Sequence, residues 1–267
     1  MTDQQRLKQI SDRILADLRA TVTELRIDEE EIHEAARFLD RLGQAGEFSD
    51  LLDIFLATTS VIALAGEAGT TPNLSGPYYK AGAPRRADGN LVERRLSDGE
   101  VPLTVSGQVL DTATDQPVPG AVLDIWQADG QGVYDETGYD LRGLVETDAD
   151  GRYAFQTLFP EGYEIPAKGP TTELLHAIGQ QNWRPAHIHL RVYIGDRTAL
   201  QTQFFLAGAD FLDCDPVDAV RDDLIIDHRA TADGRGREAT FDIRLALDRP
   251  LPPRSFSEGP KVEIASG

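Results

Sequence analysis

The chain has 267 residues, of which 40% are apolar, with a formal net charge of -19 at pH 7 and a single cysteine, Cys214. A chain of this length can bury a substantial core, as one large domain or as two unequal ones. The acidic composition argues against a nucleic-acid partner and against attraction to anionic membranes, and one cysteine excludes an intrachain disulfide and a zinc site built on several thiolates.

The N-terminal part is predicted to be helical. Apolar residues recur at intervals of three and four positions in one stripe, formed by Ile10, Ile14, Leu18, Val22 and Leu25. Asp28 and Glu31 have the spacing of a capping box, which predicts a second helix that ends at Gly43. Ser49 is a candidate N-cap for a third helix that ends at Gly66.

The same part of the chain lacks the features of export and membrane insertion. The first residues have neither the basic nor the apolar region of a signal peptide. The most apolar stretch, residues 51–65, contains Asp53 and is too short to span a bilayer comfortably. These features predict a cytoplasmic protein without a membrane-inserted segment.

The pattern changes after the helical part. Residues 70–100 are rich in Gly, Pro, Arg and Asp, which is typical of a long irregular connection. Short β-prone runs then alternate with turn signals, at residues 103–110, 121–126, 152–158, 187–194, 200–206, 224–227 and 239–247, with a short helix at 171–178. The predicted fold is α+β: a helical N-terminal domain at 1–72, a linker at 73–100, and an antiparallel β-sandwich at 101–267.

Two histidines stand two residues apart in the hexapeptide Arg184-Pro185-Ala186-His187-Ile188-His189. Side chains alternate across a strand, so His187 and His189 point to one face and can bind one metal ion. Two histidines that are hydrogen-bonded on a half-buried strand would show the same spacing. The spacing alone leaves both interpretations open.

Four further motifs accompany this hexapeptide. They are Gly76-Pro77-Tyr78-Tyr79, Asp124-Ile125-Trp126-Gln127-Ala128, Gly132-Val133-Tyr134-Asp135, and the segment from Phe159 to Pro166. With five motifs in this order, the chain resembles the intradiol ring-cleavage dioxygenases of the catechol 1,2-dioxygenase type. Two rivals, a metal-free β-sandwich binding module and a sandwich that binds zinc or copper, leave the tyrosine motifs unexplained.

The resemblance implies a non-haem Fe(III) ion held by two tyrosinates and two histidines, which are Tyr134, Tyr163, His187 and His189 in this chain. Phenolate is a hard anionic donor that suits a ferric ion. By the same resemblance, Tyr163 leaves the iron when substrate binds and takes one catechol proton. Arg184 is implied to stabilise negative charge on the ring, and Gln203 to lie beside it. Leu74, Pro77 and Tyr78 are implied to flank the substrate.

The implied reaction is the cleavage of catechol, or of a substituted catechol, by O2 to a cis,cis-muconate, a step of aromatic hydrocarbon catabolism. Gln203, which follows Thr202, favours catechol or an alkyl catechol over the alternatives, hydroxyquinol and chlorocatechol. The segment between Tyr134 and Tyr163 is short for a catechol enzyme, which leaves the preferred diol open. The helical part is implied to form a homodimer interface that holds phospholipid in some members.

Overall fold

The computed structural model of the chain describes residues 3–65, 68–165, 169–248 and 250–251. Packing divides the chain into two compact units, residues 1–48 and 49–267, which are described separately below. The predicted helix end at Gly66, Pro166 of the fourth motif and the chain end at 252–267 lie outside the described residues. The domain boundaries at residues 72 and 100 stay predictions.

The first unit contains two helices, α1 (Asp3–Leu25) and α2 (Glu29–Ala45). The predicted capping box is confirmed, because the Asp28 carboxylate accepts from the Glu31 N–H and the Glu31 carboxylate accepts from the Asp28 N–H, each at 2.9 Å. The predicted end at Gly43 is wrong. Gly43 stays helical, and the helix ends at Ala45 and is capped by Gly46, whose φ of 74° is the left-handed conformation that a C-terminal cap needs.

A nearly continuous helical stretch begins at Phe48, the last residue of the first unit, and otherwise belongs to the second unit: α3 (Phe48–Leu52), the π-helical segment η1 (Asp53–Ala57) and α4 (Thr58–Leu64). Ser49 is not an N-cap, because α3 already begins at Phe48, two residues after Gly46. The short helix α5 (Pro170–Ala177) confirms the helix predicted at 171–178 to within one residue at each end. Ile54 of η1 and Leu175 of α5 join the hydrophobic core of this unit.

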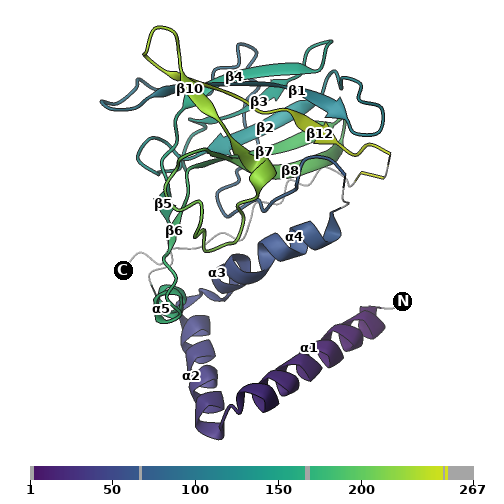
Figure 1. Cartoon of the computed structure of the whole chain (residues 1–267), viewed down its shortest axis with the longest axis vertical. Coiled ribbons are helices and arrows are strands. Elements are labelled where there is room, and N and C mark those ends of the chain that lie inside the picture. The colour runs from purple at the N-terminus through teal and green to yellow at the C-terminus, as the bar shows by residue number, and fades with distance from the viewer. Residues whose placement is uncertain (1–2, 66–67, 166–168, 249, 252–267) are drawn as a thin grey trace. The chain divides into compact units, whose positions relative to one another are not determined.

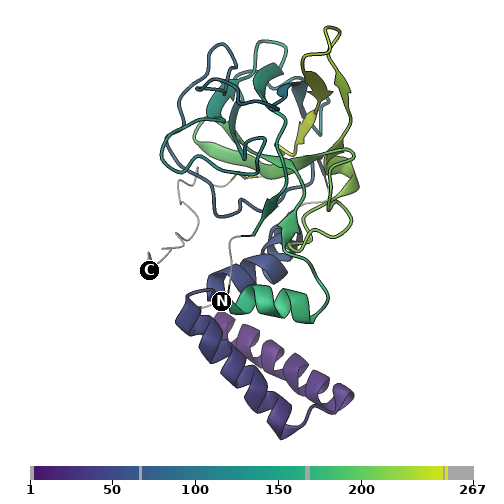
Figure 2. The same ribbon diagram turned by 90° about the vertical axis from the view of Figure 1, so that its left-hand side faces the viewer.

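Two five-stranded sheets form the body of the second unit (Figures 1 and 2). The first contains β10 (His228–Ala230), β11 (Arg237–Thr240), β1 (Pro102–Asp111) and β12 (Ile243–Leu245) in this order, and β4 (Arg152–Leu158) also pairs with β1. The second has the order β3 (Arg142–Glu146), β2 (Val122–Gln127), β7 (His187–Ile194), β8 (Arg197–Leu206) and β9 (Ile225–Ile226), the last preceded by the 3-10 turn η2 (Asp222–Leu224). A small ladder joins β5 (Tyr163–Glu164) to β6 (Trp183–Arg184).

The α+β class is confirmed, but the sandwich is not wholly antiparallel. β1 pairs in parallel with β11 and β12, and β8 pairs in parallel with β9. Parallel neighbours need a long crossover, which the chain between β1 and β11 supplies and which no local pattern reveals. Strand β3 was also missed, because Gly143 suggests a turn. A Cβ at this position would lie 2.4 Å from Arg86 Cγ of the linker, which crosses the strand here.

The central strand β7 explains how the histidines are positioned. Ile188, Leu190 and Val192 belong to the core between the sheets. Because side chains alternate along a strand, His187 and His189 lie on the opposite face. The linker covers that face, where a Cβ at Gly76 would lie 3.5 Å from His189 Cε1. The histidines are therefore buried although they do not belong to the core.

Candidate metal centre

The two histidines converge on one point. Their Nε2 atoms lie 3.1 Å apart, and the residues are only 2% and 1% exposed. His187 Nδ1 lies 2.7 Å from the carbonyl oxygen of Pro185, which only accepts, so Nδ1 carries the proton and Nε2 keeps its lone pair. A hydrogen bond from Nδ1 to a backbone carbonyl orients a histidine so that its Nε2 can bind a metal ion.

Both imidazoles are held neutral. Burial, helped by the nearby Arg184, lowers the pKa of His187, and burial with the neighbouring His187 lowers the pKa of His189. Trp126, which is opposite His189 in the β2–β7 ladder, stacks on its ring with centroids 4.9 Å apart and planes 4° apart. Neutral and sterically fixed imidazoles are the form that binds a metal ion.

Two tyrosines from distant segments reach the same place. Tyr134 lies in the loop between β2 and β3, and its Oη is 3.4 Å from His187 Nε2. Tyr163 begins β5, and its ring centroid is 5.5 Å from that of Tyr134 and 5.6 Å from that of His187. Burial, and then the neighbouring Tyr163, raise the pKa of Tyr134 well above its ordinary value, although Arg184 and Arg142 oppose this. The Tyr134 phenol therefore needs a bound cation to ionise near neutral pH.

The donor set fits a ferric ion better than zinc. Among the described residues, no group of three or more His, Cys, Asp or Glu side chains is placed to hold a metal ion. A metal at the histidine pair would therefore take its remaining protein ligands from the phenols of Tyr134 and Tyr163. Hard phenolate oxygens suit Fe(III), whereas zinc sites in proteins use Cys, His, Asp and Glu.

Arg184 and Gln203, which the resemblance implies to lie near the substrate, flank the histidines in the structure. Arg184 pairs with Tyr163 in the β5–β6 ladder, and its Nη1 lies 3.3 Å from His187 Nε2. Gln203 is opposite His189 in the β7–β8 ladder and accepts a hydrogen bond from Arg184 Nη2 at 3.2 Å. Both residues are buried, with exposed fractions of 2% and 0%.

The three predicted pocket walls have different surroundings. Tyr78 stacks on Tyr134, with ring centroids 4.2 Å apart and planes 11° apart, and it meets Tyr163 edge-on. Leu74 is buried in the hydrophobic core, and Pro77 is exposed. The structure thus brings Tyr78 into contact with the phenols, while the roles of Leu74 and Pro77 stay predictions.

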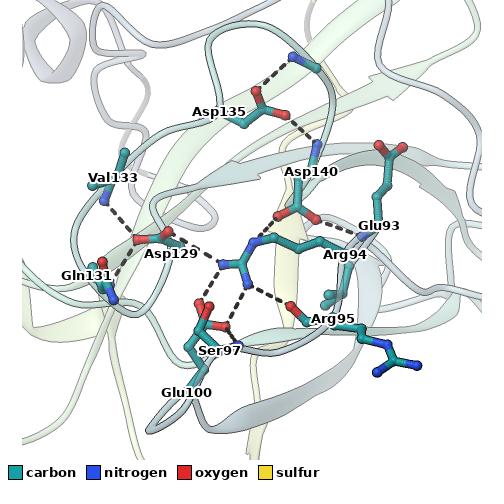
Figure 3. A network of polar contacts seen from close by, with 12 residues as sticks. Glu93, Arg94, Arg95, Ser97, Glu100, Asp129, Gln131, Val133, Asp135 and Asp140 are labelled. Carbon is teal, nitrogen blue, oxygen red and sulfur yellow. Dashed lines mark hydrogen bonds and ion pairs between the residues drawn. The ribbon is translucent and has the colours of Figure 1, made fainter.

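An ion-pair network holds the loop that carries Tyr134 (Figure 3). Arg94 of the linker donates to Glu100 at 2.7 Å and pairs with Asp140 at 3.0 Å and with Asp129 at 3.5 Å. Asp129 accepts from the Val133 N–H at 3.0 Å, so the network ties down both ends of the loop around Tyr134. Arg94 and its partners were not predicted from the sequence, because only the turn at Asp129-Gly130 gives a local signal.

Residues 74–247 match the protein family described as Dioxygenase, and residues 4–71 match the one described as Catechol dioxygenase N terminus. The chain belongs to the intradiol catechol 1,2-dioxygenase family. It is 34% identical over 252 residues to a chlorocatechol 1,2-dioxygenase of Pseudomonas sp. strain P51, across 92% of this chain and 97% of the relative. It is 37% identical over 237 residues to a catechol 1,2-dioxygenase of Acinetobacter lwoffii, across 82% and 75% respectively.

Solved structures agree with this assignment. The crystal structure of a chlorocatechol 1,2-dioxygenase from Pseudomonas putida superposes with a TM-score of 0.82 at 31% identity, across 91% of this chain and 99% of that one. This intradiol dioxygenase is therefore a ring-cleaving oxygenase that acts on catechols, and its family uses non-haem iron. In the described part of the chain, no helix is long and apolar enough to cross a membrane.

Proposed function

We propose that this intradiol dioxygenase binds Fe(III) through Tyr134, Tyr163, His187 and His189 and opens catechol or a substituted catechol to a cis,cis-muconate. The observation that carries the proposal is the convergence of two imidazole Nε2 atoms and two buried phenols, while no group of three or more His, Cys, Asp or Glu side chains in the described part of the chain could hold the metal instead. These four residues would hold the iron, which would supply a Lewis acid that the two catechol oxygens could chelate and that would polarise the ring toward O2.

The surrounding side chains supply the other functions that the reaction needs. Tyr163, which begins the short strand β5, would take a proton from one catechol hydroxyl. The Arg184 guanidinium stabilises negative charge on the ring in a buried place where electrostatic interactions are strong. Tyr78 covers the phenol of Tyr134 and limits access of water.

Catechol or an alkyl catechol is the first candidate substrate, on the basis of Gln203. Chlorocatechol and hydroxyquinol are the other candidates, and one observation favours them: solved chlorocatechol and hydroxyquinol 1,2-dioxygenases from Pseudomonas putida superpose with a TM-score of 0.82, and a catechol 1,2-dioxygenase from Acinetobacter sp. ADP1 with 0.72. The ratio of kcat/KM values for catechol, 4-methylcatechol, chlorocatechols and hydroxyquinol separates these candidates. A preference of at least about tenfold for a chlorocatechol would exclude the first.

The helical part supports a proposed homodimer. Helix α1 has no buried residue, and its apolar side chains Leu7, Ile14 and Leu18 are 65%, 53% and 56% exposed. An exposed apolar stripe of this kind is expected to pack against a second chain or to bind acyl chains of phospholipid. Location in the cytoplasm stays a prediction.

The decisive experiment is the visible absorption spectrum of the purified protein, with iron quantified, before and after catechol is added without O2. We expect a broad tyrosinate-to-iron band that moves to longer wavelength when catechol binds. A protein that contains stoichiometric iron but has no visible band would exclude the tyrosinate ligands. A protein that stays free of iron after reconstitution would exclude the whole site.

A further inference from the structure

A closed ring of hydrogen bonds lies behind the guanidinium of Arg184. Arg184 Nε and Nη2 donate to the two carboxylate oxygens of Asp215 at 3.1 and 3.2 Å, and Nη2 also donates to Gln203 Oε1 at 3.2 Å. Gln203 Nε2 donates to Asn73 Oδ1 at 2.9 Å. Asn73 Nδ2 donates to the Ala219 carbonyl oxygen at 2.7 Å, and the Ala219 N–H closes the ring on Asp215 Oδ2 at 3.2 Å.

This ring is sealed from solvent. The side chains of Arg184 and Asp215 are 3% and 2% exposed, and the residues Asn73, Gln203 and Ala219 are fully buried. The charges of Arg184 and Asp215 are paired, and the side-chain amides of Gln203 and Asn73 each use both their oxygen and their nitrogen in hydrogen bonds, as buried polar groups require. A change in one member leaves a buried partner unsatisfied, so the ring has a single low-energy arrangement.

The ring determines which part of Arg184 faces the metal centre. Asp215 and Gln203 occupy Nε and Nη2, so Nη1 is the group left to approach His187 Nε2 at 3.3 Å. The planar guanidinium holds its donors in a rigid fork, so Asp215 fixes the plane and rotation of the whole group.

Asn73 links this ring to the linker that covers the histidines. Its Oδ1 accepts from the Leu74 N–H at 2.8 Å, and its N–H donates to the Gln201 carbonyl oxygen of β8 at 2.9 Å. Asn73 therefore fixes the start of the linker segment that leads to Tyr78, and it fixes this segment against the part of β8 that contains Gln203.

We propose that Asp215 and Asn73 are positioning residues of the dioxygenase, which orient the Arg184 guanidinium toward the reacting ring and hold the linker against it. Neither residue belongs to the predicted site. The inference rests on the proposed role of Arg184 in stabilising charge during the reaction. It predicts that loss of either residue lowers the rate of ring opening without removing the metal ligands.

Asp215→Asn is the first test, because it keeps the side-chain shape and removes the charge that pairs with Arg184. Asp218→Asn is the matched control in the same loop: the Asp218 side chain is 83% exposed and pairs with Arg221. Asn also tolerates the positive φ of 47° at this position. For each protein, iron content, the visible band, the anaerobic catechol affinity and kcat per iron are measured.

We expect Asp215→Asn to keep the visible band and to change the anaerobic catechol affinity little, while kcat per iron falls about tenfold to a hundredfold. Asp218→Asn is expected to match the wild type. A purely structural role would instead lower the melting temperature and leave kcat per iron unchanged, and that result would overturn the proposal.

Asn73→Ala provides a second test, which leaves no buried charge unpaired and is therefore expected to disturb folding less than Asp215→Asn does. We expect kcat per iron to fall about threefold to tenfold, as for the loss of a neutral hydrogen bond. A value within about twofold of the wild type, with a normal visible band, would overturn the role of Asn73. A wild-type protein that has no iron band or no catechol cleavage would mean instead that the underlying function is wrong.

Discussion

At the scale of single residues, the proposed iron site depends on the ionisation of Tyr134. Its phenol is buried and lies 3.4 Å from His187 Nε2, and burial raises its pKa. Burial stabilises the neutral phenol, so only a nearby cation makes the phenolate favourable. The position of Tyr134 is therefore compatible with a metal ligand and unfavourable for an anion in the absence of metal.

The first prediction concerns Tyr134→Phe, which removes one anionic donor and keeps the ring that stacks on Tyr78. We expect loss of most of the iron or of the visible band, and loss of activity. Tyr139→Phe is the control, because the Tyr139 hydroxyl in the same loop donates to the Ala81 carbonyl oxygen at 2.9 Å. A Tyr134→Phe protein with full iron and full turnover would exclude Tyr134 as a ligand.

At the scale of structural elements, Arg94 holds the loop between β2 and β3 in place through its ion pairs with Asp129 and Asp140. Glu100 is the main partner of Arg94, and this hydrogen bond, against the opposing effect of burial, lowers the pKa of Glu100 to about 2. The folded-state pKa is below the ordinary value of 4.5, so the unfolded chain binds the proton more readily. The stability from this pair is present above the ordinary pKa and is lost as the pH falls toward 2.

The second prediction follows from this network. Glu100→Gln is expected to lower the free energy of unfolding at pH 7 by about 1.5–3 kcal/mol, the range for hydrogen bonds to charged groups. It should also flatten the loss of stability between pH 4.5 and 2 in urea unfolding curves. Glu146→Gln is the control, because Glu146 pairs with Arg85 at the surface. Equal stabilities of the two variants at pH 7 would contradict this prediction.

The third prediction concerns α2. Asp28→Ala removes the side-chain acceptor of the capping box and is expected to destabilise the first unit by about 1 kcal/mol. Hydrogen exchange of the amide of Glu31 would report this change locally. Asp40→Ala, at an exposed position within the same helix, is the control. If both substitutions change the exchange of this amide equally, the cap contributes nothing.

At the scale of the whole molecule, the fourth prediction concerns assembly. We expect a dimer in sedimentation experiments, and Leu18→Glu to shift it toward the monomer by placing a charge in the apolar stripe of α1. Leu96→Glu is the control, at an exposed apolar position of the second unit. A wild-type protein that is monomeric at micromolar concentration would refute the proposed homodimer.

Local patterns were sufficient for part of this enzyme. The capping box joins Asp28 to a residue only three positions further along the chain. The common face of His187 and His189 depends on the alternation of side chains along one strand. The helix ends were harder to predict. Both Gly43 and Gly46 can end a helix, and the choice depends on which glycine adopts the left-handed conformation.

Long-range pairing was not readable from these patterns. The parallel contacts of β1 join segments that are far apart in the chain, and β3 is a strand although it contains Gly143. The buried partners Asp215 and Asn73 also have no local signal, because an aspartate in a loop or an asparagine in a linker is ordinarily a turn residue.

The sequence by itself determined the presence of the helices but not all of their ends, most of the strands, the shared face of the histidines and, through its five motifs, the family. Each of these depends on residues that are close along the chain or on motifs in a fixed order. Only the tertiary structure decided that Arg184 is held by Asp215, Gln203 and Asn73 and that Arg94 anchors the loop of Tyr134. Those contacts form between distant segments whose positions depend on the packing of both sheets, so no local spacing specifies them.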